Sequence, residues 1–489
     1  MIATGAPETT AFIEFLVTAL LVAAWLVSAC IAAAHAIMYK RDPRSSAIWL
    51  LLSFFLPIAG PWMYWVIGIN RVERRAVRHL GRREQPFDAA PIDPETIESA
   101  EQACILGPLR GLYRVSQRVT RLPMLPGNRV TPLHCGEEAY PRMLHAIENA
   151  RRSITLASYI FDWDDVGRQF ATAMEAAAGR GVRVHVLVDG VGALGHFSRM
   201  GRLLLKSGAE VASFFPLRFP LGRLRINLRN HRKILVVDGT VGFTGGMNIT
   251  ERHLVRLDKP QRAEDLHFEL SGPVVSELQH TFAEDWRLAT GKVLLGENYF
   301  PPLERAGATL CRGIVSGPDE DFEDIHIIIR AALSAAQKSV YMVTPYYVPT
   351  PSLVSATTTA ALRGVDVKLI LPSVLDLPYM RWAADAYLWQ LLERGIEVYR
   401  RPPPFAHTKL MIVDDQWVLF GSANLDRRSF RLNFEFNVEA YDKEFAGMMR
   451  ARVEAALARS TPVTLEQIDA RPMWRRLRDG TVKLFSPYL

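Results

Sequence analysis

The chain has 489 residues, of which 49% are hydrophobic and 22% charged, and its formal net charge is +7. This length exceeds one ordinary domain and allows about three folded units. A hydrophobic content near one half together with a slightly positive mean hydropathy suggests that part of the chain lies in lipid. The four cysteines are scattered, with neither a C-x-x-C pair nor a histidine cluster at zinc-ligand spacing, so no disulfide framework, metal site or other cofactor is expected.

Two apolar runs near the N-terminus predict transmembrane helices over about residues 12–38 and 47–69. The first contains 20 consecutive residues without an ionisable side chain, 15–34, and the second contains 23, 47–69. Either run can cross a hydrocarbon layer of about 30 Å. Only eight residues connect them, so we expect an antiparallel hairpin, whose second segment is kinked or re-entrant at Pro57, Gly60 and Pro61. A cleaved signal peptide is the alternative for the first run, but no Lys or Arg precedes it.

A basic segment follows the second run and completes a predicted membrane region, residues 1–85. Six arginines in this segment outnumber the three cations of the connecting loop, so the positive-inside rule favours a cytoplasmic catalytic portion. Residues 1–84 carry a net charge of +4, which leaves +3 for the other 405 residues. A nearly neutral catalytic part disfavours a nucleic-acid partner. The arginines suit the anionic headgroups of a bilayer, or serve only as a topological anchor.

Beyond about residue 110 the sequence is duplicated with a long period. Arg180-Gly181-Val182-Arg183-Val184 opens an apolar run, and Arg363-Gly364-Val365-Asp366-Val367 opens the matching run. Short β-branched runs alternate with helical patterns in both halves, which indicates an α/β layer architecture. A repeat of this period indicates two similar domains in one chain.

The most specific repeat is a motif that occurs once in each half at the same spacing. His231-Arg232-Lys233, Asp238 and Gly245-Gly246-Met247-Asn248 recur as His407-Thr408-Lys409, Asp414 and Gly421-Ser422-Ala423-Asn424. Each copy supplies an imidazole, an ammonium and an amide. Together the copies supply what phosphodiester exchange through a covalent intermediate needs, because one histidine can attack while the other protonates the leaving group.

The repeated H-x-K-x4-D-x6-G-[GS]-x-N pattern resembles the signature of the phospholipase D superfamily. More narrowly, segments 405–409, 421–429 and 432–437, together with 40–43 and the tail 484–489, resemble bacterial cardiolipin synthases. This resemblance covers nearly the whole chain. It implies an α/β fold with two pseudo-symmetric phospholipase D-like domains, each a mixed sheet flanked by helices, at residues 86–305 and 306–489 behind the transmembrane hairpin.

The resemblance also implies the reaction. We expect a multi-pass enzyme of the bacterial inner membrane that joins two phosphatidylglycerol molecules into cardiolipin and releases glycerol, through a phosphohistidine and without a metal. Hydrolysis to phosphatidic acid, or transfer with phosphatidylethanolamine or another alcohol, is the alternative, because acceptor choice depends on the shape and dryness of the pocket. A tethered nuclease is disfavoured by the charge distribution, and a nonenzymatic scaffold by the intact motifs.

Analogy to the superfamily assigns roles to the motif residues. His231 is the nucleophile and His407 the acid and base, with the reverse assignment left open. An acid 25 to 35 residues after each histidine orients it in this superfamily, which pairs Asp265 with His231 and Glu435 with His407. Asp238 and Asp414 are expected to anchor turns rather than to carry protons. The expected phosphate ligands are Lys233, Lys409, Asn248, Asn424 and Ser422.

The stretch between Val211 and Val237 combines arginines with aromatic residues and contains no acid. We hypothesise that it dips into the membrane interface and recruits anionic lipid. A solvated loop is the alternative. The residues concerned are Phe214, Phe215, Phe219, Arg218, Arg223, Arg225, Arg229 and Arg232.

Overall fold

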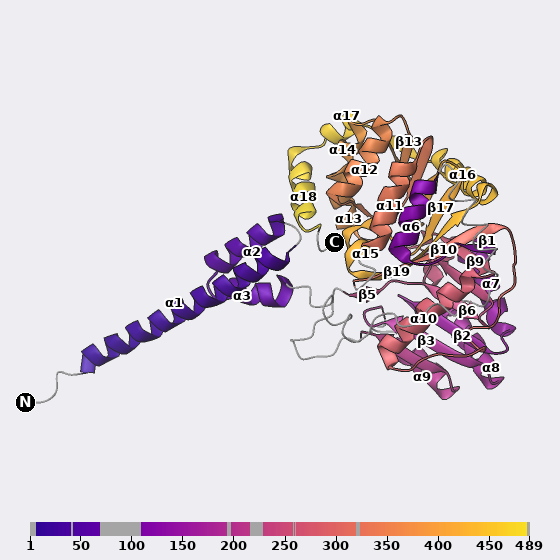
Figure 1. Cartoon of the computed structure of the whole chain (residues 1–489), viewed down its shortest axis with the longest axis horizontal. Coiled ribbons are helices and arrows are strands. Elements are labelled where there is room, and N and C mark those ends of the chain that lie inside the picture. The colour runs from indigo at the N-terminus through magenta and orange to yellow at the C-terminus, as the bar shows by residue number, and fades with distance from the viewer. Residues whose placement is uncertain are drawn as a thin grey trace, which may run out of the picture. The chain divides into compact units, whose positions relative to one another are not determined.

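The structure is a computed structural model of the chain (Figure 1). It describes residues 6–40, 43–68, 109–192, 197–215, 228–257, 259, 261–318 and 323–486. The chain forms two compact units, and all described residues from 109 onward belong to the larger one. The basic segment 70–85 and most of the proposed interface segment, 216–227, lie outside the described residues.

The N-terminal unit is built on one long apolar helix. It contains α1 (Ala6–Tyr39), α2 (Pro43–Phe55), α3 (Ala59–Met63) and the π-helical turn η1 (Tyr64–Gly68). Residues Ala11–Tyr39 of α1 are long and apolar enough to cross a membrane, and no other helix in the described part of the chain is. Ala32 and Ala36 of α1 pack in a buried cluster with Trp49 and Tyr64.

The predicted second apolar segment, 47–69, is a broken helix. Helix α2 ends at Phe55, and Ile58 has a φ of +62° before α3 begins. Pro57 lacks an amide hydrogen and disfavours helical conformation in the residue before it, so the helix cannot run through this point. The sequence expected a break at Pro57, and the structure confirms it. That the segment enters the membrane stays a prediction.

The large unit is built on one mixed sheet of 16 strands. From one edge to the other the strands are β20 (Thr461–Val463), β14 (Glu397–Arg401), β13 (Asp366–Pro372), β11 (Ser339–Val343), β16 (Leu410–Val413), β17 (Trp417–Gly421), β19 (Asn433–Tyr441), β10 (Thr309–Ser316), β1 (Leu125–His134), β9 (Leu266–Ser271), β7 (Val241–Gly245), β6 (Ile234–Val237), β2 (Ser153–Ser158), β3 (Arg183–Asp189) and β4 (Glu210–Phe214), with β5 (Arg229–Asn230) paired to β19. Two short pairs lie apart from it, β12 (Tyr347–Val348) with β18 (Leu425–Asp426) and β15 (Phe405–Ala406) with β8 (Ala263–Glu264).

The strand order reads the same outward from the central β1–β10 pair. On one side follow β9, β7, β6, β2, β3 and β4, and on the other β19, β17, β16, β11, β13 and β14. At the centre β1 and β10 run antiparallel, with Leu125 opposite Cys311 and Asn128 opposite Thr309. The expectation of two pseudo-symmetric α/β halves is therefore confirmed. Their proposed limits, 86–305 and 306–489, stay predictions.

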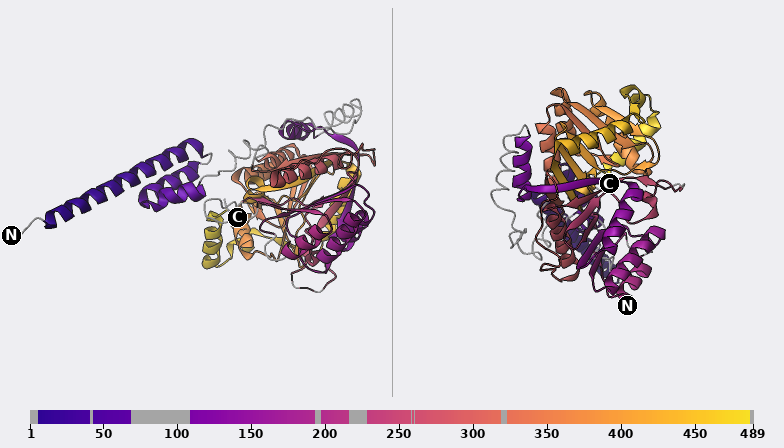
Figure 2. Two further views of the ribbon diagram at one scale, coloured as in Figure 1. Left: turned by 90° about the horizontal axis from the view of Figure 1, so that it is seen from below. Right: turned by 90° about the vertical axis from the view of Figure 1, so that its right-hand side faces the viewer.

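Helices cover both halves, and the halves share one core. In Figures 1 and 2, α7 and α8 lie over strands of the first half and α11 and α12 over strands of the second. A third hydrophobic cluster joins the halves, and in it the ring centroids of Phe268 and Phe420 lie 4.0 Å apart. The helices are α6 (Arg110–Thr120), α7 (Cys135–Glu148), α8 (Asp165–Gly179), α9 (Phe197–Lys206), η3 (Glu251–His253), α10 (Val274–Thr290), α11 (Asp324–Ala335), α12 (Pro351–Leu362), α13 (Pro378–Asp385), α14 (Leu388–Leu392), α15 (Arg427–Arg431), α16 (Lys443–Leu457), α17 (Leu465–Asp469) and α18 (Met473–Leu484).

The interface hypothesis is wrong for three of its residues, because Phe214, Arg229 and Arg232 are buried. Phe214, expected to dip into the bilayer, is fully buried at the end of β4. Its ring centroid lies 5.0 Å from that of Phe434 in the core shared by the halves. The pairing of β4 with β3 turns this side chain inward, so it cannot contact lipid.

Candidate active site

Each motif histidine is positioned by backbone from the other half. The amide of His231 donates to the carbonyl of Phe434 at 2.9 Å, which continues the parallel pairing of β5 with β19. The amide of His407 donates to the carbonyl of Glu264 at 2.7 Å, which continues the pairing of β15 with β8. Each histidine therefore lies beside the acid-bearing segment of the opposite half.

The carboxylates that hold the imidazoles are crossed between the halves. Nδ1 of His231 lies 3.0 Å from Oε2 of Glu435, and Nδ1 of His407 lies 2.8 Å from Oδ2 of Asp265. Both carboxylates are fully buried. The sequence found both acids but paired each with the histidine of its own half, and that pairing is wrong. The cause is the backbone pairing of β5 with β19 and of β15 with β8, which places each histidine beside the acid of the other half.

Two buried lysines stand next to the histidines. Lys233 Nζ donates to the carbonyl of His231 at 2.7 Å, and Lys409 Nζ donates to the carbonyl of His407 at 2.6 Å. Lys409 Nζ also lies 3.0 Å from both ring nitrogens of His407. Burial lowers the pKa of Lys233 to about 7 and that of Lys409 to about 8. A bound anion would restore their charge.

Burial also keeps the imidazoles neutral. It lowers the pKa of His231, while the charge of Glu435 acts in the opposite direction. It lowers the pKa of His407 well below its ordinary value, and the charges of Lys409 and Lys233 add to this effect. Glu435 has a lowered pKa although burial alone would raise it, because His231 and Lys233 stabilise its charge. A neutral imidazole with Nδ1 held by a carboxylate presents Nε2 as a nucleophile.

The motif asparagines lie at equivalent places in the halves. The backbone amide of Asn248 donates to Nε2 of His253 at 3.2 Å, and the backbone amide of Asn424 donates to Oγ of Ser429 at 3.2 Å. Both asparagines line the cavity that holds the histidines. Oδ1 of Asn424 has no hydrogen-bond partner among the described residues, which leaves it free for a ligand.

The structure places Ser422 differently from the sequence analysis. Its side chain is fully buried, and Oγ donates to Oε2 of Glu435 at 2.5 Å. It therefore stabilises a carboxylate instead of contacting a phosphate. The equivalent Gly246 leaves the space that Asp265 occupies, since a Cβ there would lie 2.3 Å from the Asp265 carboxylate.

The motif aspartates lie away from the cavity and bind backbone. Asp238 accepts from the amides of three successive residues, 151–153, at 2.7–3.1 Å, and Asp414 accepts from those of 337–339 at 2.7–2.9 Å. Their φ values are +52° and +53°. Both carboxylates tie the turn after a motif strand to the start of the neighbouring strand, as the sequence analysis expected.

One cavity of about 330 Å³ contains both histidines. Tyr159 directly follows β2 and Tyr346 lies shortly after β11, and their ring centroids lie 5.3 Å from that of His231 and 6.4 Å from that of His407, respectively. The sequence analysis missed these tyrosines, although the duplicated segments around them offered the signal. The lining residues are Tyr159, Ile160, Arg229, His231, Asn248, Thr250, Arg252, His253, Ala263, Tyr346, Asp376, Leu377, Tyr379, Met380, Phe405, His407, Asn424, Asp426, Arg428 and Asn433.

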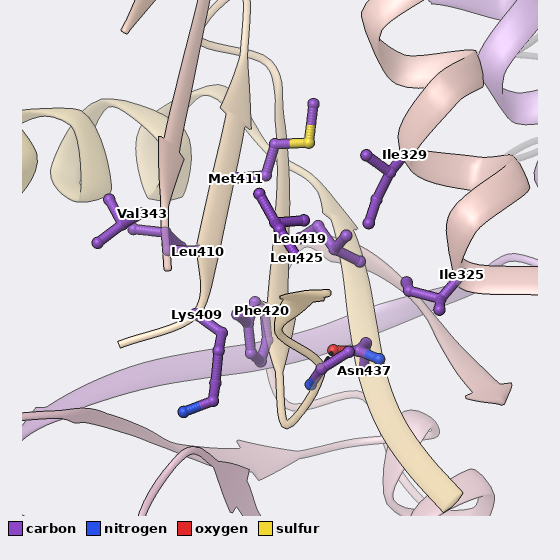
Figure 3. A pocket seen from close by; sticks show the side chains of 11 residues that line it. Ile325, Ile329, Val343, Lys409, Leu410, Met411, Leu419, Phe420, Leu425 and Asn437 are labelled. Atoms are coloured by element: carbon purple, nitrogen blue, oxygen red, sulfur yellow. Dashed lines mark hydrogen bonds between the residues drawn. The ribbon is translucent and has the colours of Figure 1, made fainter. Parts of the chain in front are cut away.

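A second, apolar void lies behind the second motif (Figure 3). It measures about 20 Å³ and is lined by residues such as Ile325, Ile329 and Met411. A space of this size holds a water-sized group at most, so no lipid binds there. In Figure 3, the ammonium end of Lys409 points away from these apolar side chains. The larger cavity, which contains both histidines, is therefore the candidate active site.

Comparisons with known proteins agree with this site. A family model described as "Cardiolipin synthase, PLD-like domain" matches residues 143–286 and 329–457, which contain both motifs. A model described as "Phospholipase_D-nuclease N-terminal" matches residues 27–68. Cardiolipin synthase A of Pseudomonas aeruginosa (strain LESB58) is 35% identical over 463 residues, 94% of each chain. Cardiolipin synthase 2 of Staphylococcus epidermidis (strain ATCC 35984) is 30% identical over 97% of this chain and 99% of its own.

A solved structure shows the same fold. The phosphatidylserine synthase of Haemophilus influenzae Rd KW20 superposes with a TM-score of 0.62 at 15% identity, covering 77% of this chain and 100% of that one. Two pseudo-symmetric halves that bring both motifs to one cavity form a phospholipase D-like protein, and the similarity to cardiolipin synthases indicates a phosphatidyltransferase of this type. Within that class, the chain belongs to the phospholipase D-like cardiolipin synthase family.

Proposed function

We propose that this protein is a cardiolipin synthase that transfers the phosphatidyl group of one phosphatidylglycerol to a glycerol hydroxyl of a second one. The observation that supports this most is the single cavity that contains both imidazoles, each bound by a buried acid of the opposite half. Such a site provides a nucleophile and a proton donor for the same phosphorus atom. The similarity to cardiolipin synthases over nearly the whole chain supports the choice of lipid.

In the first displacement, Nε2 of one neutral histidine attacks the phosphorus, and the bond from phosphorus to the glycerol oxygen breaks. By analogy His231 attacks and His407 donates the proton to the departing oxygen; the reverse assignment is the alternative. The phosphate anion counteracts the desolvation that keeps His407 neutral, and Asp265 stabilises the resulting imidazolium. Glycerol leaves, and a phosphatidyl group remains on the histidine.

In the second displacement, a glycerol hydroxyl of the second phosphatidylglycerol gives its proton to His407, and its oxygen attacks the phosphorus. The bond between phosphorus and Nε2 breaks, and cardiolipin forms. Protons balance over the two steps, and no nucleotide is consumed because one phosphodiester replaces another. Lys233 and Lys409, with Asn248 and Asn424, would stabilise the charge on the nonbridging oxygens.

The N-terminal unit would anchor this enzyme. We propose that α1 crosses the bacterial inner membrane, that the segment from α2 through η1 completes a multi-pass hairpin, and that the catalytic unit faces the cytoplasm. The apolar span of α1 and the excess of arginines after residue 70 support this topology. Labelling of single cysteines placed between α1 and α2 and on the catalytic unit, from either side of sealed vesicles, tests it.

The products from phosphatidylglycerol vesicles test the proposed function. The purified full chain should form cardiolipin and release one glycerol for each cardiolipin. Phosphatidic acid as the main product would instead identify a hydrolase, with water as the acceptor. His231→Ala and His407→Ala should each abolish turnover, and activity retained by both variants would exclude this site.

A further inference from the structure

Three arginines line the cavity, and the displacement steps use none of them. Arg252 lies 3.9 Å from the Asp376 carboxylate, which leaves Arg229 and Arg428. Arg229 is 2% exposed, and neither terminal nitrogen of its guanidinium has a hydrogen-bond partner among the described residues. Its paired carboxylate, Asp189, lies 3.7 Å away. That carboxylate accepts hydrogen bonds from the amides of Val191 and Asn230 instead. A buried guanidinium with free donors is costly unless an anion completes its hydrogen bonds.

Arg428 adds a second positive charge to the same wall. It lines the cavity from α15 and is half-buried. Burial lowers the pKa of Arg229, and the charge of Arg428 lowers it further, so the two cations repel each other. A phosphate between them would relieve this repulsion. Planar guanidinium groups bind phosphate oxygens in pairs, which suits such a ligand.

Arg229 has no counterpart in the second half. Arg229 lies two residues before His231, whereas the equivalent residue before His407 is Phe405. Residues two apart in extended chain lie on the same side, about 6–7 Å from each other. The cavity therefore offers one anion position beside the histidines and a second beside Arg229. In cardiolipin, two phosphates are likewise joined through one glycerol.

We propose that Arg229 and Arg428 bind the phosphate of the acceptor phospholipid while its glycerol headgroup attacks the phosphorus held between the histidines. This inference rests on the proposed function and extends it, because it explains why a second phospholipid is chosen over water or a neutral alcohol. Loss of either arginine should weaken use of the charged acceptor more than use of an uncharged one.

The test compares acceptors in proteoliposomes of phosphatidylglycerol with added ethanol. For Arg229→Gln and Arg428→Gln, the ratio of cardiolipin to phosphatidylethanol should fall about ten- to hundredfold, the effect expected for a lost charged hydrogen bond. Arg142→Gln is the matched control, because Arg142 is exposed and pairs with Glu269 at 2.8 Å on the surface. An unchanged ratio in both variants would overturn the phosphate site. If the wild type forms phosphatidylethanol but no cardiolipin, the proposed function itself is contradicted.

A different observation concerns the C-terminal helix α18. Five large apolar side chains of α18 and the following residue are 59–77% exposed: Met473, Trp474, Leu477, Leu484 and Phe485. At helical spacing they share one stripe, and cations stand on both sides of it, at Arg475, Arg476, Arg478 and Lys483. An apolar stripe between cationic edges is the pattern of a helix that lies in the interface of an anionic membrane.

The other face of α18 packs on the wall of the active site. Val482 packs against the cluster that contains Met380 and Tyr387, and the guanidinium of Arg478 lies 4.3 Å from the ring of Trp382. Helix α13, which carries Trp382, supplies Tyr379 and Met380 to the cavity lining. The geometry points to a bilayer of anionic lipid as the partner of the exposed stripe, so that α18 brings the cavity next to its lipid substrate.

Fluorescence quenching in proteoliposomes of the full chain tests this contact. The Trp474 signal is the difference between the wild type and Trp474→Phe, and lipids brominated on the acyl chain should quench it. Trp389→Phe provides the matched control, since Trp389 is 41% exposed on α14 and should be quenched by aqueous acrylamide instead. Quenching of the Trp474 signal by acrylamide alone, or protection from both quenchers by a protein surface, would overturn the proposal.

Discussion

Glu435 binds Nδ1 of His231 across the boundary between the two halves of the molecule, 204 residues away in the chain. The reciprocal bond joins Asp265 to His407. Neither half therefore holds a complete histidine–carboxylate pair of its own. The site depends on the shared sheet and on the core that fixes the halves together.

The crossed pairs predict which step each acid supports. We expect Glu435→Gln to reproduce the phenotype of His231→Asn, and Asp265→Asn that of His407→Asn. The measurement uses a phosphatidyl ester of p-nitrophenol, whose leaving group needs no acid. With His231 as nucleophile, the His407 and Asp265 variants should release one burst of nitrophenol and accumulate the lipid adduct, detected by mass spectrometry. The His231 and Glu435 variants should show almost no burst, since loss of such an orienting acid costs about 10⁴-fold in a related triad.

The matching of phenotypes does not depend on which histidine attacks. If His407 is the nucleophile, the His407 and Asp265 variants should both lose the burst, and the His231 and Glu435 variants should both keep it. Agreement of Glu435→Gln with His407→Asn, and of Asp265→Asn with His231→Asn, would contradict the crossed geometry.

The motif aspartates should act on stability. Asp238→Asn and Asp414→Asn each weaken a cluster of hydrogen bonds from backbone amides to a carboxylate, so each should reduce the unfolding free energy by about 1–3 kcal/mol. The measurement is the thermal unfolding midpoint of the detergent-solubilised chain. Asp165→Asn is the control, because this residue is exposed on α8 and should change stability by less than about 0.5 kcal/mol. An unchanged midpoint with abolished turnover would indicate a chemical role instead.

The buried lysines predict how activity depends on pH. Their pKa values, about 7 for Lys233 and about 8 for Lys409, lie below the ordinary lysine value. Each lysine is charged below its pKa and loses its charge as pH rises, so kcat/KM should fall through pH 7–8 as phosphate binding weakens. On the acid side, kcat/KM should fall only below the ordinary histidine range, because the attacking His231 must be neutral and burial lowers its pKa.

Arginine substitutions separate the two lysines. Lys233→Arg keeps its charge at all these pH values, so the alkaline decline should move up to the value set by Lys409. Lys409→Arg should leave the decline near 7. The measurement is kcat/KM for phosphatidylglycerol between pH 5 and pH 9.5 at constant ionic strength. A flat alkaline side in the wild type would contradict the account.

Gly246 should be intolerant of a side chain. A Cβ at this position would lie 2.3 Å from the carboxylate that binds His407, so Gly246→Ala should displace Asp265 and lower kcat by about 10²-fold or more. Gly447→Ala on α16 is the control, because no atom lies within 4 Å of its added Cβ. Equal turnover in both variants would show that the Asp265 contact is dispensable.

The sequence predicted much of this site because its histidines, lysines and asparagines belong to a repeated motif. The α/β halves, both histidines and both lysines followed from the repeat and its resemblance to a known family. The crossing of Asp265 and Glu435 did not, because spacing along the chain does not reveal that β5 pairs with β19 and β15 with β8. Arg229 was noted only as one of a run of surface arginines, since its burial depends on tertiary packing.

The stereochemistry at phosphorus tests the central claim most directly. Phosphatidylglycerol with an isotopically chiral phosphate should yield cardiolipin with retained configuration at the transferred phosphorus, because two in-line displacements through a phosphohistidine invert it twice. Inversion in the product would mean a single direct displacement, and the account of two histidines acting in turn on one phosphorus would be contradicted.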